Sequence, residues 1–372
     1  MTLDAHAWSP PQRPEIVFDS LKIDGILSAH DFVAQSFAVA LQGIRAEGSG
    51  KVAYSDGWHV RSKLSHVDMP LARLMSMLGV SRDLTGSLHV AGELGCDGNT
   101  LGDLKNNFHF SGNVRLKKAA YRLAAEFKQP LLFDEIDAHV AAQADRITVS
   151  ALAAKLYDGK MTGNAVVTRN KSLLKADVWA SNISMQPLVE ALTNEVLFSG
   201  RMNGAATLAM HLDAKALFPE NMRLDGNFHL RNGALSKLDL VQAVSKPGKI
   251  PERLGTTRFD DLTGVLNVDT AGLHFSKIQL ASGSINASGR VDVSPALQLD
   301  GALDADIKGT AGLVSMPMVI SGTINKPVVR PSGTALAGAA VGTAILGPGV
   351  GTALGVRIGG FLNKVLGGQE GK

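Results

Sequence analysis

The sequence is poor in cysteine, aromatic residues and charge. Its 372 residues include a single cysteine, Cys96, so no disulfide can form within the chain. Aromatic residues make up 5 %, charged residues 19 %, and the net charge is only +3. Nucleic-acid binding requires a basic surface, commonly with aromatic residues interleaved. These shortages argue against nucleic acid as a partner.

Long apolar runs are also missing from most of the chain. No stretch before residue 330 approaches the ~20 apolar residues that a membrane-spanning helix needs. The opening residues, MTLDAHAWSPPQRPEIVFDS, lack the basic segment followed by an apolar segment that marks an export signal. We expect residues 1–13 to form a flexible N-terminus ahead of the folded region.

Catalytic motifs are missing as well. The segment EGSGK at 47–51 fails the phosphate-loop pattern because Val52 follows the lysine, and neither GxSxG nor HExxH occurs. The ten histidines are scattered. His109 and His229 stand between apolar residues, so we expect them to point away from an apolar face into solvent rather than to bind metal. The sequence therefore predicts no enzyme activity, no catalytic residues, no metal and no cofactor.

Repetition is the strongest positive signal. The segments VFDSLKIDGIL, LFDEIDAHV and RFDDLTGVLNV, which begin at Val17, Leu132 and Arg258, share Phe-Asp-x-Leu/Ile. Two short helical patterns, PLARLMSML and PLVEALTN, open with Pro70 and Pro187, and proline suits the first turn of a helix. The repeating unit is roughly 115 to 125 residues long. The predicted repeats cover approximately 14–129, 130–256 and, in part, 257–331.

Within each repeat the apolar residues recur with a period of two. NNFHFSGNVRL at 106–116 alternates apolar with polar or small residues, and GNFHLRNGAL at 226–235 echoes it. Alternate side chains of a strand lie on the same face. Because turn residues recur at roughly 8 to 12 residue intervals, the pattern predicts an antiparallel β-meander with one apolar and one polar face and a few short helices.

The apolar face of such a meander allows two interpretations. In an ordinary β-sandwich the face is simply the core. The lack of a linker between the repeats and the scarcity of Trp and Tyr argue against separate compact domains. A meander of some 25 strands would instead extend on the order of 100 Å, and its twist would curl it into an elongated trough. The gap across such a trough must then be filled by side chains or by acyl chains.

The C-terminal tail, 332–372, has a different amino-acid composition, rich in glycine and alanine. Glycines recur every four residues in TALAGAAVGTAILGPGVGTALGVRIGGFLNKVLGG, a spacing that lets helices pack closely in membranes. The GPG at 347–349 divides the tail into halves of ~20 to 25 Å, shorter than a ~30 Å hydrocarbon core. We expect a helical hairpin that inserts partly into the membrane, lies at its surface, or plugs the end of the sheet. A low-complexity tail packed on the last strand is the alternative. The predicted tail residues are Gly338, Gly342, Gly351, Gly355 and Gly359.

The chain resembles the C-terminal region of AsmA-family proteins. The resemblance rests on SGTINKPVVRP at 321–331 with the Gly/Ala-rich tail, and on DLTGSLHVAGEL with LKNNFHFSGNVRL and its echo. It implies a repeating β-groove in the periplasm, associated with the inner membrane, that carries phospholipid toward the outer membrane. The single N-terminal membrane helix typical of the family is not seen in this sequence.

The resemblance implies that apolar strand residues line the groove and contact phospholipid acyl chains. It also implies inner- or outer-membrane proteins as further partners. Two other hypotheses remain at this point, a non-enzymatic scaffold for outer-membrane protein assembly and a compact β-sandwich of other function. The expected lining residues are Phe108, Phe110, Val114, Leu116, Phe228, Leu230, Leu273, Phe275, Ile285, Val291, Leu299 and Leu303.

Overall fold

The computed structural model describes residues 1–9, 17–77, 84–122, 128–212, 221–245, 255–309 and 312–333. The described chain is mainly β: its nineteen strands belong to one open sheet, and consecutive strands pair antiparallel wherever the register is described. The predicted mainly β, antiparallel meander with a few short helices is therefore confirmed. The predicted helical hairpin lies outside the described residues.

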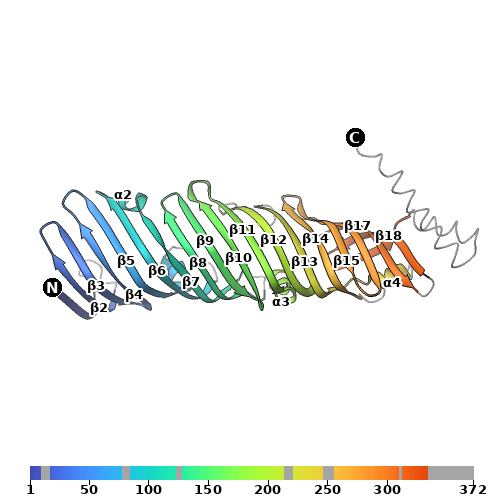
Figure 1. Ribbon diagram of the computed structural model, residues 1–372, viewed down its shortest axis with the longest axis horizontal. Coiled ribbons are helices and arrows are strands. Elements are labelled where there is room, and N and C mark those ends of the chain that lie inside the picture. Colours follow the sequence, from blue (N-terminus) through green and yellow to red (C-terminus); the bar gives the residue numbers. More distant parts are fainter. Residues whose placement is uncertain are drawn as a thin grey trace, which may run out of the picture. The chain divides into compact units, whose positions relative to one another are not determined.

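The chain divides into two compact units, which are described separately. Unit 1 comprises residues 1–179 and 209–213. In this unit each strand from β1 to β10 pairs with the next, and neighbouring ribbons follow chain order in Figure 1. Its elements are β1 (Thr2–Trp8), β2 (Phe18–Leu27), β3 (Asp31–Leu41), β4 (Ile44–Ala53), β5 (Trp58–Pro70), α1 (Leu71–Met77), β6 (Leu84–Gly98), α2 (Leu101–Asn106), β7 (His109–Tyr121), β8 (Leu131–Gln143), β9 (Arg146–Leu156), β10 (Gly159–Thr168) and the 3₁₀ turn η1 (Arg169–Lys171).

Unit 2 comprises residues 180–208 and 214–372. In this unit each strand from β13 to β19 pairs with the next. The strands β11 (Leu173–Ser184) and β12 (Phe198–His211) contain residues of both units. The other elements are α3 (Met185–Thr193), β13 (Met222–Ser236), α4 (Leu240–Ser245), β14 (Thr256–Asp269), β15 (Gly272–Ala281), β16 (Ile285–Val293), β17 (Leu299–Gly309), β18 (Gly312–Thr323) and β19 (Lys326–Pro331).

Two-residue turns explain how the strands of unit 1 can follow one another so closely. Gln42 and Gly43, between β3 and β4, have φ of 49° and 84°. Tyr157 and Asp158, between β9 and β10, have φ of 46° and 60°. A positive φ at both central residues is the signature of the type I′ turn, whose twist matches that of the strands it joins. Next to each turn the strands pair directly, Leu41 with Ile44 and Leu156 with Gly159.

The N-terminus differs from the sequence-based expectation. Residues 1–13 were expected to be flexible, whereas Thr2–Trp8 form β1 and pair with β2. Leu3 lies opposite Ile23, and the Trp8 ring lies 5.7 Å from that of Phe18. A short alternating segment therefore becomes a strand because a complementary strand stands beside it, a contact that local sequence does not reveal.

Both helical patterns opened by proline are present. Pro70 is the last residue of β5 and α1 follows it directly, while Pro187 lies in the first turn of α3. The order of four strands, an α-helix and a further strand occurs from β2 to β6 and, with the 3₁₀ turn η1 added between β10 and β11, from β8 to β12. The repeat boundaries stay a prediction, since the two compact units do not follow them.

Candidate functional site

The apolar face of unit 1 runs across the strands from β2 to β10. Directly opposed residues of antiparallel strands lie on the same face, so the register assigns each side chain to a side of the sheet. Phe110 lies opposite Leu94 on β6 and Ala142 on β8. Val114 and Leu116 belong to the same face, which continues through aliphatic residues of every strand from β2 to β10. Its members include Ile23, Phe32, Val52, Val60, Val90, Leu94, Phe110, Val114, Leu116, Ile136, Val149 and Val167.

This face is only half-buried. Phe110, Val114 and Leu116 are all of intermediate exposure, as are nearly all their counterparts on the other strands. Phe108, which precedes β7, is 39 % exposed, and Trp58 at the start of β5 is 49 % exposed. A packed protein interior leaves such side chains almost no contact with water. The structure thus leaves much of the apolar face of unit 1 accessible.

Some residues on this face are buried. Leu21, Val67, Ala154 and Leu156 are 8 % exposed or less, and three others form a small cluster at α1. Leu71, the first residue of α1, packs with Leu88 and Ala119, and all three are nearly inaccessible. The helix contacts β5 and β6, so it covers the ends of these strands. Val114 and Leu116 pack against the edge of this cluster, whereas Phe110 lies outside it.

The opposite face of unit 1 carries charged pairs between neighbouring strands. Arg61 donates to Asp97 at 2.8 Å, and His59 contacts the second oxygen of the same carboxylate at 2.8 Å. These bonds lower the pKa of Asp97 to about 2, with the Arg61 hydrogen bond as the largest cause. Lys155 similarly donates to Glu135 at 2.7 Å and lowers the pKa of that carboxyl. This face remains hydrated and ionic.

The apolar face of unit 2 is assembled in the same way but is packed. Leu230, Ile285 and Leu303 are 4 %, 1 % and 7 % exposed and belong to a continuous core. These three were expected to line a groove; the structure makes them core residues instead. The helix α4 contacts β14, β17 and β19, and its Leu240 is 1 % exposed. The sheet of unit 2 therefore packs around an inserted helix.

The remaining predicted residues of unit 2 are half-buried on the same face. Phe228 and Phe275 meet edge to face with ring centroids 6.1 Å apart. Phe228, Val291 and Leu299 pack against the core, and Leu273 lies opposite Val293. Their placement on one face matches the alternation in the sequence. The predicted tail glycines Gly338, Gly342, Gly351, Gly355 and Gly359 lie outside the described residues.

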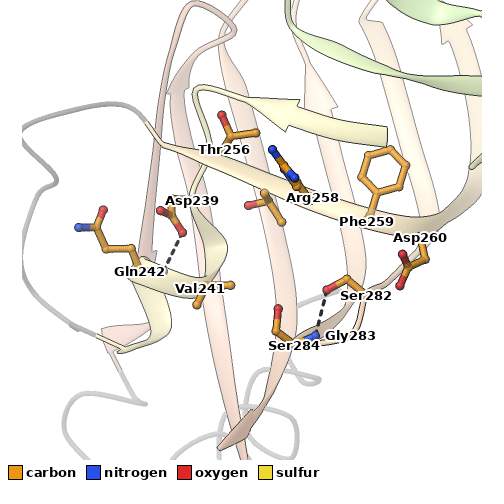
Figure 2. Close-up of a pocket in the computed structure, with 11 residues that line it drawn as sticks. Asp239, Val241, Gln242, Thr256, Arg258, Phe259, Asp260, Ser282, Gly283 and Ser284 are labelled. Carbon is orange, nitrogen blue, oxygen red and sulfur yellow. Dashed lines mark hydrogen bonds between the residues drawn. The ribbon is translucent and has the colours of Figure 1, made fainter. Parts of the chain in front are cut away.

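A pocket of about 720 Å³ with a mixed polar and apolar lining opens beside α4. Figure 2 shows Asp239, Val241 and Gln242 at the helix, residues 256–260 on β14, and residues 282–284 in the β15–β16 turn. The Asp239 carboxylate accepts the Gln242 amide at 2.8 Å and thus caps α4. Ser282 accepts the Ile285 amide at 3.2 Å and holds the turn. These groups are engaged in stabilising local structure, so the pocket is not the candidate site.

Sequence reasoning missed two features of the structure. The first is α4, although Asp239 followed by the apolar LVQAV segment is a helix-start signal that a closer scan could have found. The second is a group of two histidines and an aspartate, His66, Asp68 and His89, on the polar face of unit 1. The HxD spacing on one strand is visible in the sequence, but the third member comes from the neighbouring strand through the register.

Comparison of the chain with family models, with curated proteins and with solved structures returned no significant match. None of the helices that the structure describes is long and apolar enough to cross a membrane. The candidate functional site is therefore defined by geometry alone: it is the half-exposed apolar face of unit 1.

Proposed function

We propose that the chain is an AsmA-like lipid-transport protein whose apolar face in unit 1 shields the acyl chains of phospholipid. On this proposal the protein acts in the periplasm, associated with the inner membrane, and moves lipid between the inner and outer membranes in support of outer-membrane biogenesis. The tail would add contact with a membrane surface. The chain needs no catalytic residue for this role, only an apolar surface that lipid can occupy.

One observation carries the proposal. The residues Leu94, Phe110, Ala142, Ile147 and Val167 lie opposite one another from β6 to β10, and each is half-buried. Large exposed apolar surfaces on proteins usually mark binding sites. A surface that crosses five strands without a polar interruption suits a long flexible hydrocarbon better than a compact polar ligand.

The energetics favour lipid as the occupant. Burying one methylene group contributes roughly 0.8 kcal/mol, so exposing a sixteen-carbon chain to water costs on the order of 12 kcal/mol. The face offers aliphatic side chains for the tails, while water remains in reach of a charged headgroup. The exposed rings of Trp58 and Phe108 lie near one end of β5 and β7, where the apolar surface meets water.

Organic extraction and mass spectrometry of the purified protein test the proposal. We expect phospholipid to co-purify with the full chain. Phe110→Asp should remove most of the bound lipid, because it places a charge in the middle of the apolar row. Asn113→Asp is the matched control: it introduces the same residue nearby on the polar face, where Asn113 contacts His139 at 3.2 Å, and should leave lipid content unchanged.

Two results would count against this function. The first is a chain free of lipid after gentle purification that also takes none from phospholipid vesicles. The second is equal lipid content in Phe110→Asp and Asn113→Asp. If the lipid-free chain instead bound unfolded segments of outer-membrane proteins, the scaffold hypothesis would replace the lipid carrier.

A further inference from the structure

Two histidines and an aspartate converge on the polar face of unit 1. His66 Nε2 contacts one carboxylate oxygen of Asp68, and His89 Nδ1 contacts the other. The candidate ligand atoms of all three residues lie within 4.8 Å of one another. The two imidazole rings are 6.4 Å apart between centroids and inclined at 43°. Two imidazole nitrogens thus contact the two oxygens of a single carboxylate.

The β-sheet geometry builds this cluster from adjacent strands. His66 and Asp68 are alternate residues of β5 and lie on the same face, and His89 of β6 stands directly opposite Asp68. The register between β5 and β6 shifts between Leu64 and Val67, which marks a β-bulge. Bulges redirect the side chains beside them. This one places His66 next to Asp68 while Leu64 and Val67 stay on the apolar face.

Other histidines on the polar faces do not form such a group. His274 contacts Asp292 at 2.7 Å and Asp269 at 3.3 Å, so it is one imidazole between two carboxylates. His59 shares Asp97 with Arg61, a permanent cation. In the part of the chain that the structure describes, the cluster of His66, Asp68 and His89 is the one set of three ligand-bearing residues with metal-binding spacing.

We propose that His66, Asp68 and His89 bind a divalent transition-metal ion, with Zn²⁺ as the representative ion. His66 Nε2, His89 Nδ1 and one Asp68 oxygen would be the protein ligands. Three protein ligands and a water molecule are a common zinc environment, with metal–nitrogen and metal–oxygen distances of about 2.0 to 2.2 Å. Imidazole nitrogen selects ions of the zinc, nickel and copper group, whereas Ca²⁺ and Mg²⁺ require mostly oxygen ligands.

The surroundings suit an open site. The side chains of His66, Asp68 and His89 are 53 %, 32 % and 31 % exposed, so water can complete the coordination. On the neighbouring strand β4, Glu47 lies opposite His66 and adds a nearby negative charge. Arg45 opposite Asp68 and Arg115 opposite His89 add positive charge, but Arg115 is held by Asp137 at 2.5 Å. The bound ion would join β5 to β6 through side chains.

The consequence is a metal-dependent gain in stability of unit 1. An ion that binds the folded chain and not the unfolded chain shifts unfolding to higher temperature. The apolar face lies on the opposite side of the same strands, so the ion would fix the lipid-binding strands without touching lipid. This role is independent of the proposed lipid transport and can be tested without any lipid.

The test uses tag-free full-length protein stripped of metal with a chelator. Titration with Zn²⁺ by calorimetry should show one saturable site per chain, and Co²⁺ should give a visible absorption band from the same site. His66→Gln and His89→Gln, made separately, should each weaken Zn²⁺ binding by about 10- to 100-fold or more, since even loss of an outer partner of a metal ligand has an effect in that range. The melting temperature should rise with Zn²⁺ in the wild type only.

Matched controls separate a specific site from general histidine binding. His274→Gln removes a histidine that also contacts two aspartates and should leave the Zn²⁺ affinity unchanged. Circular dichroism checks that each variant keeps its β content. The proposal is overturned if the wild type shows no saturable site, if both cluster variants bind Zn²⁺ as the wild type does, or if Ca²⁺ and Mg²⁺ bind as well as Zn²⁺.

Discussion

The apolar faces of the two units show the same alternation of apolar and polar residues but differ in how deeply their side chains are buried. In unit 2, opposed residues from β13 to β18 form a row that is fully buried: Leu230, Leu262, Leu280, Ala287, Ala305 and Met316. In unit 1, the row through Phe110 from β6 to β10 is half-buried throughout. The same strand pattern thus provides a buried row in unit 2 and a half-buried row in unit 1.

The helix α4 accounts for much of this difference. It lies between β13 and β14 in sequence and packs against β14, β17 and β19. Buried Thr257 fixes its start, since the hydroxyl accepts the Leu240 amide at 2.9 Å and donates to the Leu238 carbonyl at 2.7 Å. In unit 1, α1 lies at the ends of β5 and β6 and contacts these two strands. The α4 residues Leu240 and Ala243 thus belong to the buried core that the strands of unit 2 form.

The largest expected effect comes from truncating matched leucines in the two faces. Leu303→Ala in unit 2 removes a fully packed side chain and should lower the free energy of unfolding by about 2 to 5 kcal/mol. Leu94→Ala in unit 1 should cost only about 1 kcal/mol, because its side chain is already partly exposed to water. Urea unfolding of both variants, followed by fluorescence and circular dichroism, measures the difference. Equal losses would mean that the two faces are packed alike.

A smaller effect on stability is expected from the polar face of unit 2, because the polar faces of both units are exposed to water. The hydrogen bond from His274 to Asp292, followed by that to Asp269, raises the pKa of His274 above its ordinary 6.5. The protonated ring is then favoured in the folded state. Its stabilisation is complete below the unfolded pKa and is lost as the pH rises through the folded pKa.

His274→Gln should therefore destabilise the protein more in mild acid than in base. We expect a loss of about 0.5 kcal/mol at about pH 5.5 and little loss at about pH 8.5, a small effect because the pair is partly exposed to water. Urea midpoints of the wild type and the variant at the two pH values measure it. An equal loss at both values would show that the ion pairs of His274 contribute nothing.

The sequence predicts the strands and their faces because both depend on neighbouring residues. Alternation alone puts Phe110, Val114 and Leu116 on one face, and the register agrees. The depth of burial is not predicted, because Ile285 and Val114 look alike locally and differ only in what packs over them. The sequence does not predict the histidine cluster for a related reason. His66 and Asp68 are close in sequence, but His89 is brought to them only by the pairing of β5 with β6.

The central claim is that the apolar face of unit 1 is open to lipid whereas that of unit 2 is filled. Photo-crosslinking residues placed singly at Phe110, at its polar-face neighbour His109 and at buried Ile285 test this claim most directly in cells or with phospholipid vesicles. The account predicts lipid adducts at position 110 and not at 109 or 285. Adducts at 109 or 285 in place of 110, or none at any of the three, would contradict it.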